Sequence, residues 1–295
     1  MPYGCYESVS ERSLTSVVVG RVLAMRDQER LAGYVEVWWS AIEDFVGVLE
    51  QVPPEQWSTP TDLAGWDIQA CAAHTAHLES ILAGNPEETA DVGEPPHVTG
   101  SMGLYTEIGV VNRRDHQPEQ IISEIREVTS RRHAWLLDHP PTDARAKPDV
   151  VFGGVPWTWE VLLRNRPLDV WMHEQDVRRA AGLPGGLDTA PAQHTADYLA
   201  ESFGYVVAKR AGAPAGTTAV LAVDGSTPIA FTVNDAGRGE RLADVPSDPT
   251  VLLRTDRESF IVLAGGRRAP APDAVELVGA QPLGQQILDA MATTP

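Results

Sequence analysis

The sequence predicts an α plus α/β protein, with a larger helical domain followed by a small mixed α+β domain. Up to about residue 210, apolar residues recur every three or four positions over long stretches, which is typical of amphipathic helices. The small residues of GAPAGTT then interrupt the pattern, and short strand-like runs appear beyond them. At 295 residues the chain is long enough for two such domains. We therefore place the helical domain at residues 25–210 and the mixed domain at residues 211–295.

The first helix is predicted from about Asp27 to Glu50, where Tyr34, Trp38 and Phe45 belong to one apolar stripe. Residues 1–24 show no clear periodic pattern, and Met25 is a more natural beginning for this helix. We expect residues 1–24 to be a start-site extension or a disordered segment.

Further helices follow from their start and stop signals. Asp67 is placed to cap a second helix, and Pro118 to begin a third that ends near residue 138. A long loop rich in Pro, Gly and acidic residues, 87–101, separates these two and is expected to border a functional site or to be a mobile surface loop. A fourth helix is predicted over 157–181, with a kink at Pro167.

The last part of the chain is predicted to alternate between strands and helices. A helical stretch over 190–210 leads into it. Short runs rich in branched apolar residues predict strands, and two apolar periodic stretches predict helices between and after them. The strands are expected at 218–223, 229–233, 250–254 and 274–277, and the helices at 257–264 and 283–291.

Composition excludes several partners. The net charge is −18 and the pI is near 4.7, so nucleic-acid backbones and anionic membranes would be repelled. No apolar run approaches the roughly 20 residues that a membrane span needs, and no convincing secretion signal is present. Two cysteines, Cys5 and Cys71, indicate no disulfide framework. We expect a cytoplasmic protein, monomeric, whose partners are small molecules.

Three residues in two of the predicted helices form a candidate metal site. Asp169 and His173 are four residues apart and so lie on one helical face, one turn apart. His74 lies within the apolar stripe of the second helix and therefore points inward. If the two helices face each other, the three side chains converge and leave one coordination position open to water or substrate, as in catalytic metal sites.

Spacing alone leaves other interpretations open. A single histidine in an apolar stripe is often only a hydrogen-bonded core residue, and an Asp/His pair one turn apart is often a surface ion pair. Cys71 could also bind zinc together with His74, and His77 could replace His74 as a ligand.

Two segments carry a resemblance to a known family. EQWSTPTDLAGWDIQACAAH resembles the amino-terminal signature of the mycothiol-dependent maleylpyruvate isomerase family, within the wider group of DinB-like metalloenzyme bundles. RPLDVWMHEQDVRRAAGLPGG resembles the second signature of the same family. TDRESFIVLAGGR and VELVGAQPLGQQILDAM resemble its carboxy-terminal, sterol-carrier-like domain. The resemblance covers nearly the whole chain after Met25.

The resemblance implies a DinB-like four-helix bundle that holds a divalent metal, usually zinc, through His74, Asp169 and His173. The characterised isomerase of the family has glutamate where this chain has Asp169, so a shorter side chain must reach the metal here. The resemblance also implies a mycothiol-like thiol cosubstrate that attacks a small electrophile, for isomerisation or S-transfer. A metal-activated water, and hence hydrolysis, and a non-catalytic binding protein stay open as alternatives.

Two more residues are candidates for catalytic roles. Asp176 shares the helical face of Asp169 and His173, where it could orient His173, or it could form an ion pair with Arg179. Arg267 is a candidate cationic partner for an anionic substrate, in a group that otherwise comprises Arg164, Arg166, Arg178, Arg179 and Arg268, most of them expected at the surface. Glu174 is expected to be solvated.

Overall fold

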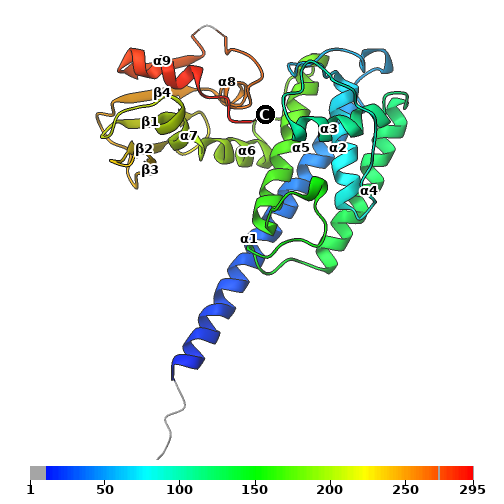
Figure 1. Ribbon diagram of the computed structural model, residues 1–295, viewed down its shortest axis with the longest axis horizontal. Coiled ribbons are helices and arrows are strands. Elements are labelled where there is room, and N and C mark those ends of the chain that lie inside the picture. Colours follow the sequence, from blue (N-terminus) through cyan, green and yellow to red (C-terminus); the bar gives the residue numbers. More distant parts are fainter. Residues whose placement is uncertain (1–10, 272, 295) are drawn as a thin grey trace, which may run out of the picture.

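A computed structural model describes residues 11–271 and 273–294, with side chains from residue 26 onward. Its larger part is a bundle of four long helices with a shorter helix alongside (Figure 1). This architecture confirms the predicted fold class. The bundle helices are α1 (Glu11–Leu49), α2 (Ile68–Leu82), α4 (Pro118–Asp138) and α5 (Trp159–Ala181), and the shorter helix is α3 (Ser101–Asn112).

Helix α1 begins earlier than predicted, at Glu11 instead of near Asp27. The segment SLTSVVVGRVLAM contains no proline and can continue the helix toward the amino terminus. Figure 1 shows these early turns projecting beyond the bundle. The first ten residues of the predicted extension over 1–24 lie outside the described residues.

The ends of the other bundle helices follow their capping signals. The Asp67 side chain accepts a hydrogen bond from the backbone N–H of Ala70 at 2.8 Å and so caps α2. Helix α4 begins at Pro118 and α5 is followed by Gly182, whose positive φ of 67° ends the helix in a left-handed conformation. Helix α5 runs through Pro167 as one continuous element.

Helix α3 was not predicted from the sequence, because no apolar stripe marks it. In the structure, only Glu107 and Gly109 of its twelve residues are buried. It packs against α2 at a glycine: a Cβ atom on Gly109 would lie 2.3 Å from the Cβ of His77. The absence of a side chain at this position therefore lets the two helices approach closely.

The carboxy-terminal domain is a five-stranded mixed sheet with helices. The strand order is β3-β2-β1-β4-β5, with β1 and β4 parallel and the other neighbours antiparallel. The four predicted strands are present, whereas β3, a polar three-residue edge strand, was missed. The strands are β1 (Thr218–Val223), β2 (Ile229–Val233), β3 (Gly239–Arg241), β4 (Val251–Thr255) and β5 (Val275–Gly279), and the helices that follow β4 and β5 are α8 (Arg257–Ala264) and α9 (Gln281–Asp289).

The connection between the domains is also helical but is not the single helix that the sequence predicts. It consists of α6 (Ala190–Ala200), the short α7 (Phe203–Tyr205) and a π-helical turn, Val206–Arg210. Helix α6 packs against both α5 and α8, so the bundle and the sheet domain share one hydrophobic core. No helix in the described part of the chain is long and apolar enough to cross a membrane.

Candidate metal centre

The predicted ligands meet between α2 and α5. Nε2 of His74 lies 3.4 Å from Oδ2 of Asp169, and Nε2 of His173 lies 3.8 Å from Oδ1 of the same carboxylate. One ligand atom from each residue falls within a group whose members all lie within 4.8 Å of one another. The two histidine side chains are buried and Asp169 remains 23% exposed, so the cluster is reachable from one side.

The hydrogen bonding of the three side chains leaves room for a bound cation. Among the described residues, Nδ1 of His74 is a buried atom without a hydrogen-bond partner. Oδ2 of Asp169 and Nδ1 of His173 face charged partners instead, Arg166 at 3.0 Å and Asp176 at 3.4 Å. Buried polar atoms are rarely left without a partner, and a bound ion or an ordered water is a common reason when they are. Two imidazoles and one carboxylate are also a donor set that Zn²⁺ accepts.

The protonation states favour metal binding as well. Burial lowers the pKa of His74, and Asp169 only partly offsets this effect, so the imidazole is neutral near pH 7. Burial alone would raise the pKa of Asp169, but Arg166 and His74 hold that pKa well below its usual value. A neutral imidazole and an ionised carboxylate are the forms that bind a metal.

Trp66 forms one wall of the cluster. Its ring centroid lies 5.0 Å from that of His74 and 5.6 Å from that of His173. The indole Nε1 donates a hydrogen bond to Oε1 of Glu107 at 2.6 Å, and the same oxygen lies 2.8 Å from Nε2 of His97. His97, in the loop before α3, is thereby linked to Trp66 through Glu107.

Asp176 lies behind His173 and joins the two domains. Its Oδ2 is 3.4 Å from Nδ1 of His173, and its Oδ1 accepts a hydrogen bond from Nη2 of Arg179 at 2.6 Å, so both contacts expected for it are present. Arg267, from the segment after α8, donates to both carboxylate oxygens at 3.1 and 3.0 Å. The Arg267 guanidinium thus pairs with a buried carboxylate, and this pairing places Arg267 behind the candidate ligands.

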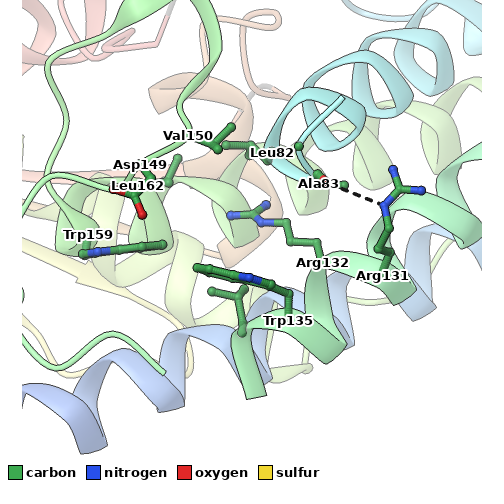
Figure 2. Close-up of a pocket in the computed structure, with 11 residues that line it drawn as sticks. Leu82, Ala83, Arg131, Arg132, Trp135, Asp149, Val150, Trp159 and Leu162 are labelled. Carbon is green, nitrogen blue, oxygen red and sulfur yellow. Dashed lines mark hydrogen bonds between the residues drawn. The ribbon is translucent and has the colours of Figure 1, made fainter. Parts of the chain in front are cut away.

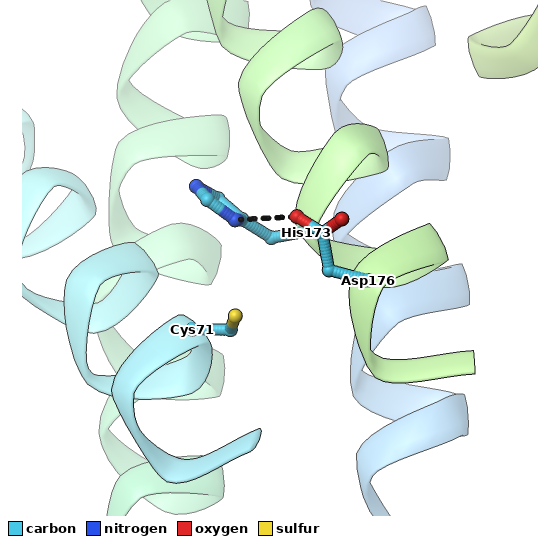
Figure 3. A group of neighbouring side chains, drawn as sticks. All are labelled: Cys71, His173 and Asp176. Atoms are coloured by element: carbon cyan, nitrogen blue, oxygen red, sulfur yellow. Dashed lines mark ion pairs between the residues drawn. The ribbon is translucent and has the colours of Figure 1, made fainter. Parts of the chain in front are cut away.

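Cys71, His173 and Asp176 form a second group of ligand atoms, which shares His173 with the first (Figure 3). Two arginines already occupy the carboxylate of Asp176. Burial, together with the nearby charge of Asp176, raises the pKa of the Cys71 thiol well above its usual value, which disfavours the thiolate that binds zinc. The group of His74, Asp169 and His173 is therefore the better candidate.

We expect Cys71→Ser to retain the full metal content of the wild type, because the favoured ligand set does not include the thiol. Asp169→Asn, which removes the anionic ligand while keeping the shape, should lower the metal affinity by about tenfold or more. Zinc titration of both variants against a chelating dye measures this difference. Loss of metal from the Cys71 variant alone would assign the site to the second group.

The remaining alternative ligand, His77, lies elsewhere. Its side chain is buried against α3, with its ring centroid 5.4 Å from that of Tyr105, and it belongs to neither ligand group of the described residues. Both ring nitrogens lack hydrogen-bond partners, and burial lowers the pKa of His77 to about 4. It is therefore a neutral core residue at pH 7.

A buried charge network next to the cluster was not predicted from the sequence. Glu79 is fully buried, and its carboxylate accepts hydrogen bonds from Nη1 of Arg132 at 2.6 Å and Nε of Arg166 at 2.9 Å. Nη1 of Arg166 in turn lies 3.0 Å from Oδ2 of Asp169. The available signal was that Glu79 is the single acidic residue of α2, whose neighbours are almost all apolar or small.

Two burial expectations near the site were wrong. Glu174, expected in solvent, is fully buried and accepts a hydrogen bond from Nε of Arg178 at 2.6 Å. Burial raises its pKa to about 7. Arg166, grouped with residues expected mostly at the surface, is fully buried too. Helix α5 is covered by the bundle on one side and by α6 on another, so few of its faces reach solvent.

Two domain families match the chain in the order of its two domains. The mycothiol maleylpyruvate isomerase N-terminal domain matches residues 38–178, and the MDMPI C-terminal domain matches residues 193–286. The chain belongs to the mycothiol maleylpyruvate isomerase family. The first match contains all three candidate ligands, and the second contains Arg267. No curated protein matches the chain.

Two solved structures are similar in fold to this chain. The crystal structure of the mycothiol-dependent maleylpyruvate isomerase aligns with a TM-score of 0.50 and 16% identity. That of a histidine-to-alanine mutant aligns with the same TM-score and 15% identity. Each alignment covers 84% of this chain and 92% of the other. At this identity the likeness establishes a shared fold, a helical domain followed by a mixed sheet domain.

Proposed function

We propose that this chain is a metal-dependent enzyme that uses a low-molecular-weight thiol of the mycothiol class on a small electrophilic substrate, by isomerisation or S-transfer. The observation that carries the proposal is the group formed by His74, Asp169 and His173, whose ligand atoms lie within 4.8 Å of one another. Membership of the isomerase family supports the thiol and the type of reaction. The acidic chain favours small molecules as its partners over nucleic acid or anionic membranes.

His74, Asp169 and His173 would hold the cation, with Zn²⁺ the first candidate for two imidazoles and a carboxylate. A bound divalent cation would supply the positive charge that stabilises a thiolate at neutral pH. The chain's own residues prepare the ligands. The carboxylate of Asp176 faces Nδ1 of His173 and favours a proton at that atom, which leaves Nε2 free for the metal. Trp66 limits access of water along one side.

The state of Cys71 supports a thiol supplied from outside the chain. Cys71 is the one free cysteine among the described residues, and its side chain is fully buried. Burial raises the pKa of this thiol well above its usual value, so it is protonated at pH 7 and a poor nucleophile. A nucleophilic sulfur at the cluster would therefore come from a cosubstrate.

Elemental analysis of the purified protein beside its His74→Ala variant tests the site. We expect about one divalent metal per chain in the wild type and less than about a tenth of that in the variant, because one of three ligands is removed. His116→Ala, at an exposed histidine outside the cluster, is the matched control and should keep its metal. Absence of metal from the wild type after incubation with zinc would refute the metal site.

Turnover assays then distinguish the reaction classes. Conversion of maleylpyruvate, or S-transfer to a model electrophile, that requires both metal and mycothiol supports the proposal. Metal-dependent turnover that proceeds equally without thiol would instead favour hydrolysis by an activated water. Stoichiometric metal with no turnover of any tested electrophile would favour a binding protein.

A further inference from the structure

A cavity lies at the end of the bundle away from the candidate metal centre. Its volume is about 410 Å³, and it is formed where α2 ends, α4 completes its last turns and α5 begins (Figure 2). Three leucines, Leu82, Leu136 and Leu162, supply apolar lining. A cavity of this size falls in the range of sites that bind small organic molecules.

One buried cation faces this cavity. The Arg132 side chain is 3% exposed, yet among the described residues only its Nη1 makes a hydrogen bond, to Glu79. One face of the guanidinium is covered by the ring of Trp38, with 4.6 Å between the guanidinium carbon and the ring centroid. Figure 2 shows the guanidinium directed into the space between Trp135 and Leu162. Its Nε and Nη2 groups are therefore available to an acceptor inside the cavity.

Aromatic side chains form the mouth of the cavity. Trp135 and Trp159 lie with their ring centroids 6.5 Å apart and an interplanar angle of 21°. Trp135 is 44% exposed and Val150, in the loop opposite, is 41% exposed, so apolar surface is left facing the opening. Large exposed apolar groups around a concave site are typical of ligand-binding grooves, and an indole face favours flat aromatic partners.

We propose that this cavity binds a planar aromatic carboxylate, with its carboxylate on the free N–H groups of Arg132 and its ring against Trp135. The rim does not set the charge preference, because it carries one residue of each sign, Arg131 and Asp149, and Arg131 already donates to Asn85. The buried guanidinium of Arg132 sets the charge preference of the cavity. This site is separate from the candidate metal centre, since Glu79 and Arg166 lie between Arg132 and Asp169.

Isothermal titration with 1-naphthoate, and with 1-naphthamide as its neutral counterpart, tests the proposal on the full chain. We expect naphthoate to bind at one site per chain and the amide to bind at least about tenfold more weakly, because a charged acceptor strengthens the bond to Arg132. Equal affinity for the two compounds, or no binding of naphthoate at millimolar concentration, would overturn the proposal.

Two variants locate the binding. Trp135→Ala removes a half-exposed ring and should weaken naphthoate binding by about tenfold, whereas Tyr205→Ala, at a 58% exposed aromatic residue in the connection between the domains, should leave it unchanged. Arg132→Gln should abolish the preference for naphthoate over the amide. If that variant does not fold, the comparison of the two compounds on the wild type still decides the charge requirement. An unaltered affinity in Trp135→Ala would place the binding elsewhere and reject the cavity.

Discussion

Replacing Asp176 with asparagine is expected to weaken zinc binding by about 10- to 100-fold and to lower the free energy of unfolding by about 3–5 kcal/mol. The first effect arises because Asp176 faces Nδ1 of His173 at 3.4 Å and favours the tautomer whose Nε2 is free. The second arises because the same carboxylate pairs with Arg267 and Arg179, whose side chains are 5% and 13% exposed. Neutral asparagine would leave the Arg267 guanidinium buried without its anion, while Arg179 would keep its contact of 2.6 Å with Asp62. Zinc titration against a chelating dye and urea unfolding measure the two effects.

A surface ion pair supplies the control for the Asp176 variant. Arg164 and Glu201 form a contact of 2.6 Å, the same length as that between Arg179 and Asp176, but Glu201 is 49% exposed. Glu201→Gln should therefore cost less than about 1 kcal/mol and leave the zinc affinity unchanged. Should Asp176→Asn bind zinc as tightly as the wild type, Asp176 would have a structural role alone, as the partner of Arg179 and Arg267.

The predicted ends of α2, α4 and α5 agree best with the structure, because local signals determine them, whereas α1 begins well before its predicted start, at Glu11. Asp67 caps α2, Pro118 begins α4 and Gly182 follows α5, and each signal lies within a turn of the helix end that it sets. The elements that were missed lack such signals. Helix α3 buries little of its surface, and strand β3 is a three-residue edge strand without an apolar residue. Their positions depend on tertiary contacts that a local pattern does not contain.

For the candidate site, the sequence predicts which helical faces carry the ligands, but not the contacts between residues far apart in the chain. The spacing of Asp169 and His173 places them on one face of a helix, and the apolar stripe around His74 turns it inward. The pairing of Asp176 with Arg267 joins residues 91 positions apart, so it follows only from the docking of the two domains. The burial of Glu174 likewise depends on what covers α5, because a glutamate on a long helix is usually solvated.

Replacing Glu79 with glutamine is expected to lower the free energy of unfolding by about 3–5 kcal/mol at neutral pH, because two buried arginines lose their shared anion. Arg132 and Arg166 both donate to Glu79, and Trp38 donates to it at 3.1 Å. Burial alone would raise the pKa of Glu79, but the two arginines hold it below its ordinary value of 4.5. Because the pKa is depressed in the folded protein, this stabilisation is present above pH 4.5 and is lost as the pH falls through the lower, folded-state value.

The difference in unfolding free energy between the wild type and Glu79→Gln should therefore shrink as the pH is lowered from about 7 to about 3, since a protonated glutamate resembles glutamine. Urea unfolding at a series of pH values measures this convergence. Glu127→Gln is the matched control: Glu127 pairs with Arg131 but is 75% exposed, so its loss should cost less than about 1 kcal/mol at every pH. A constant difference across the pH range would mean that Glu79 stabilises the bundle through packing and not through its charge. Convergence would show that one ionised carboxylate holds together the two arginines between the cavity of Figure 2 and the candidate metal centre.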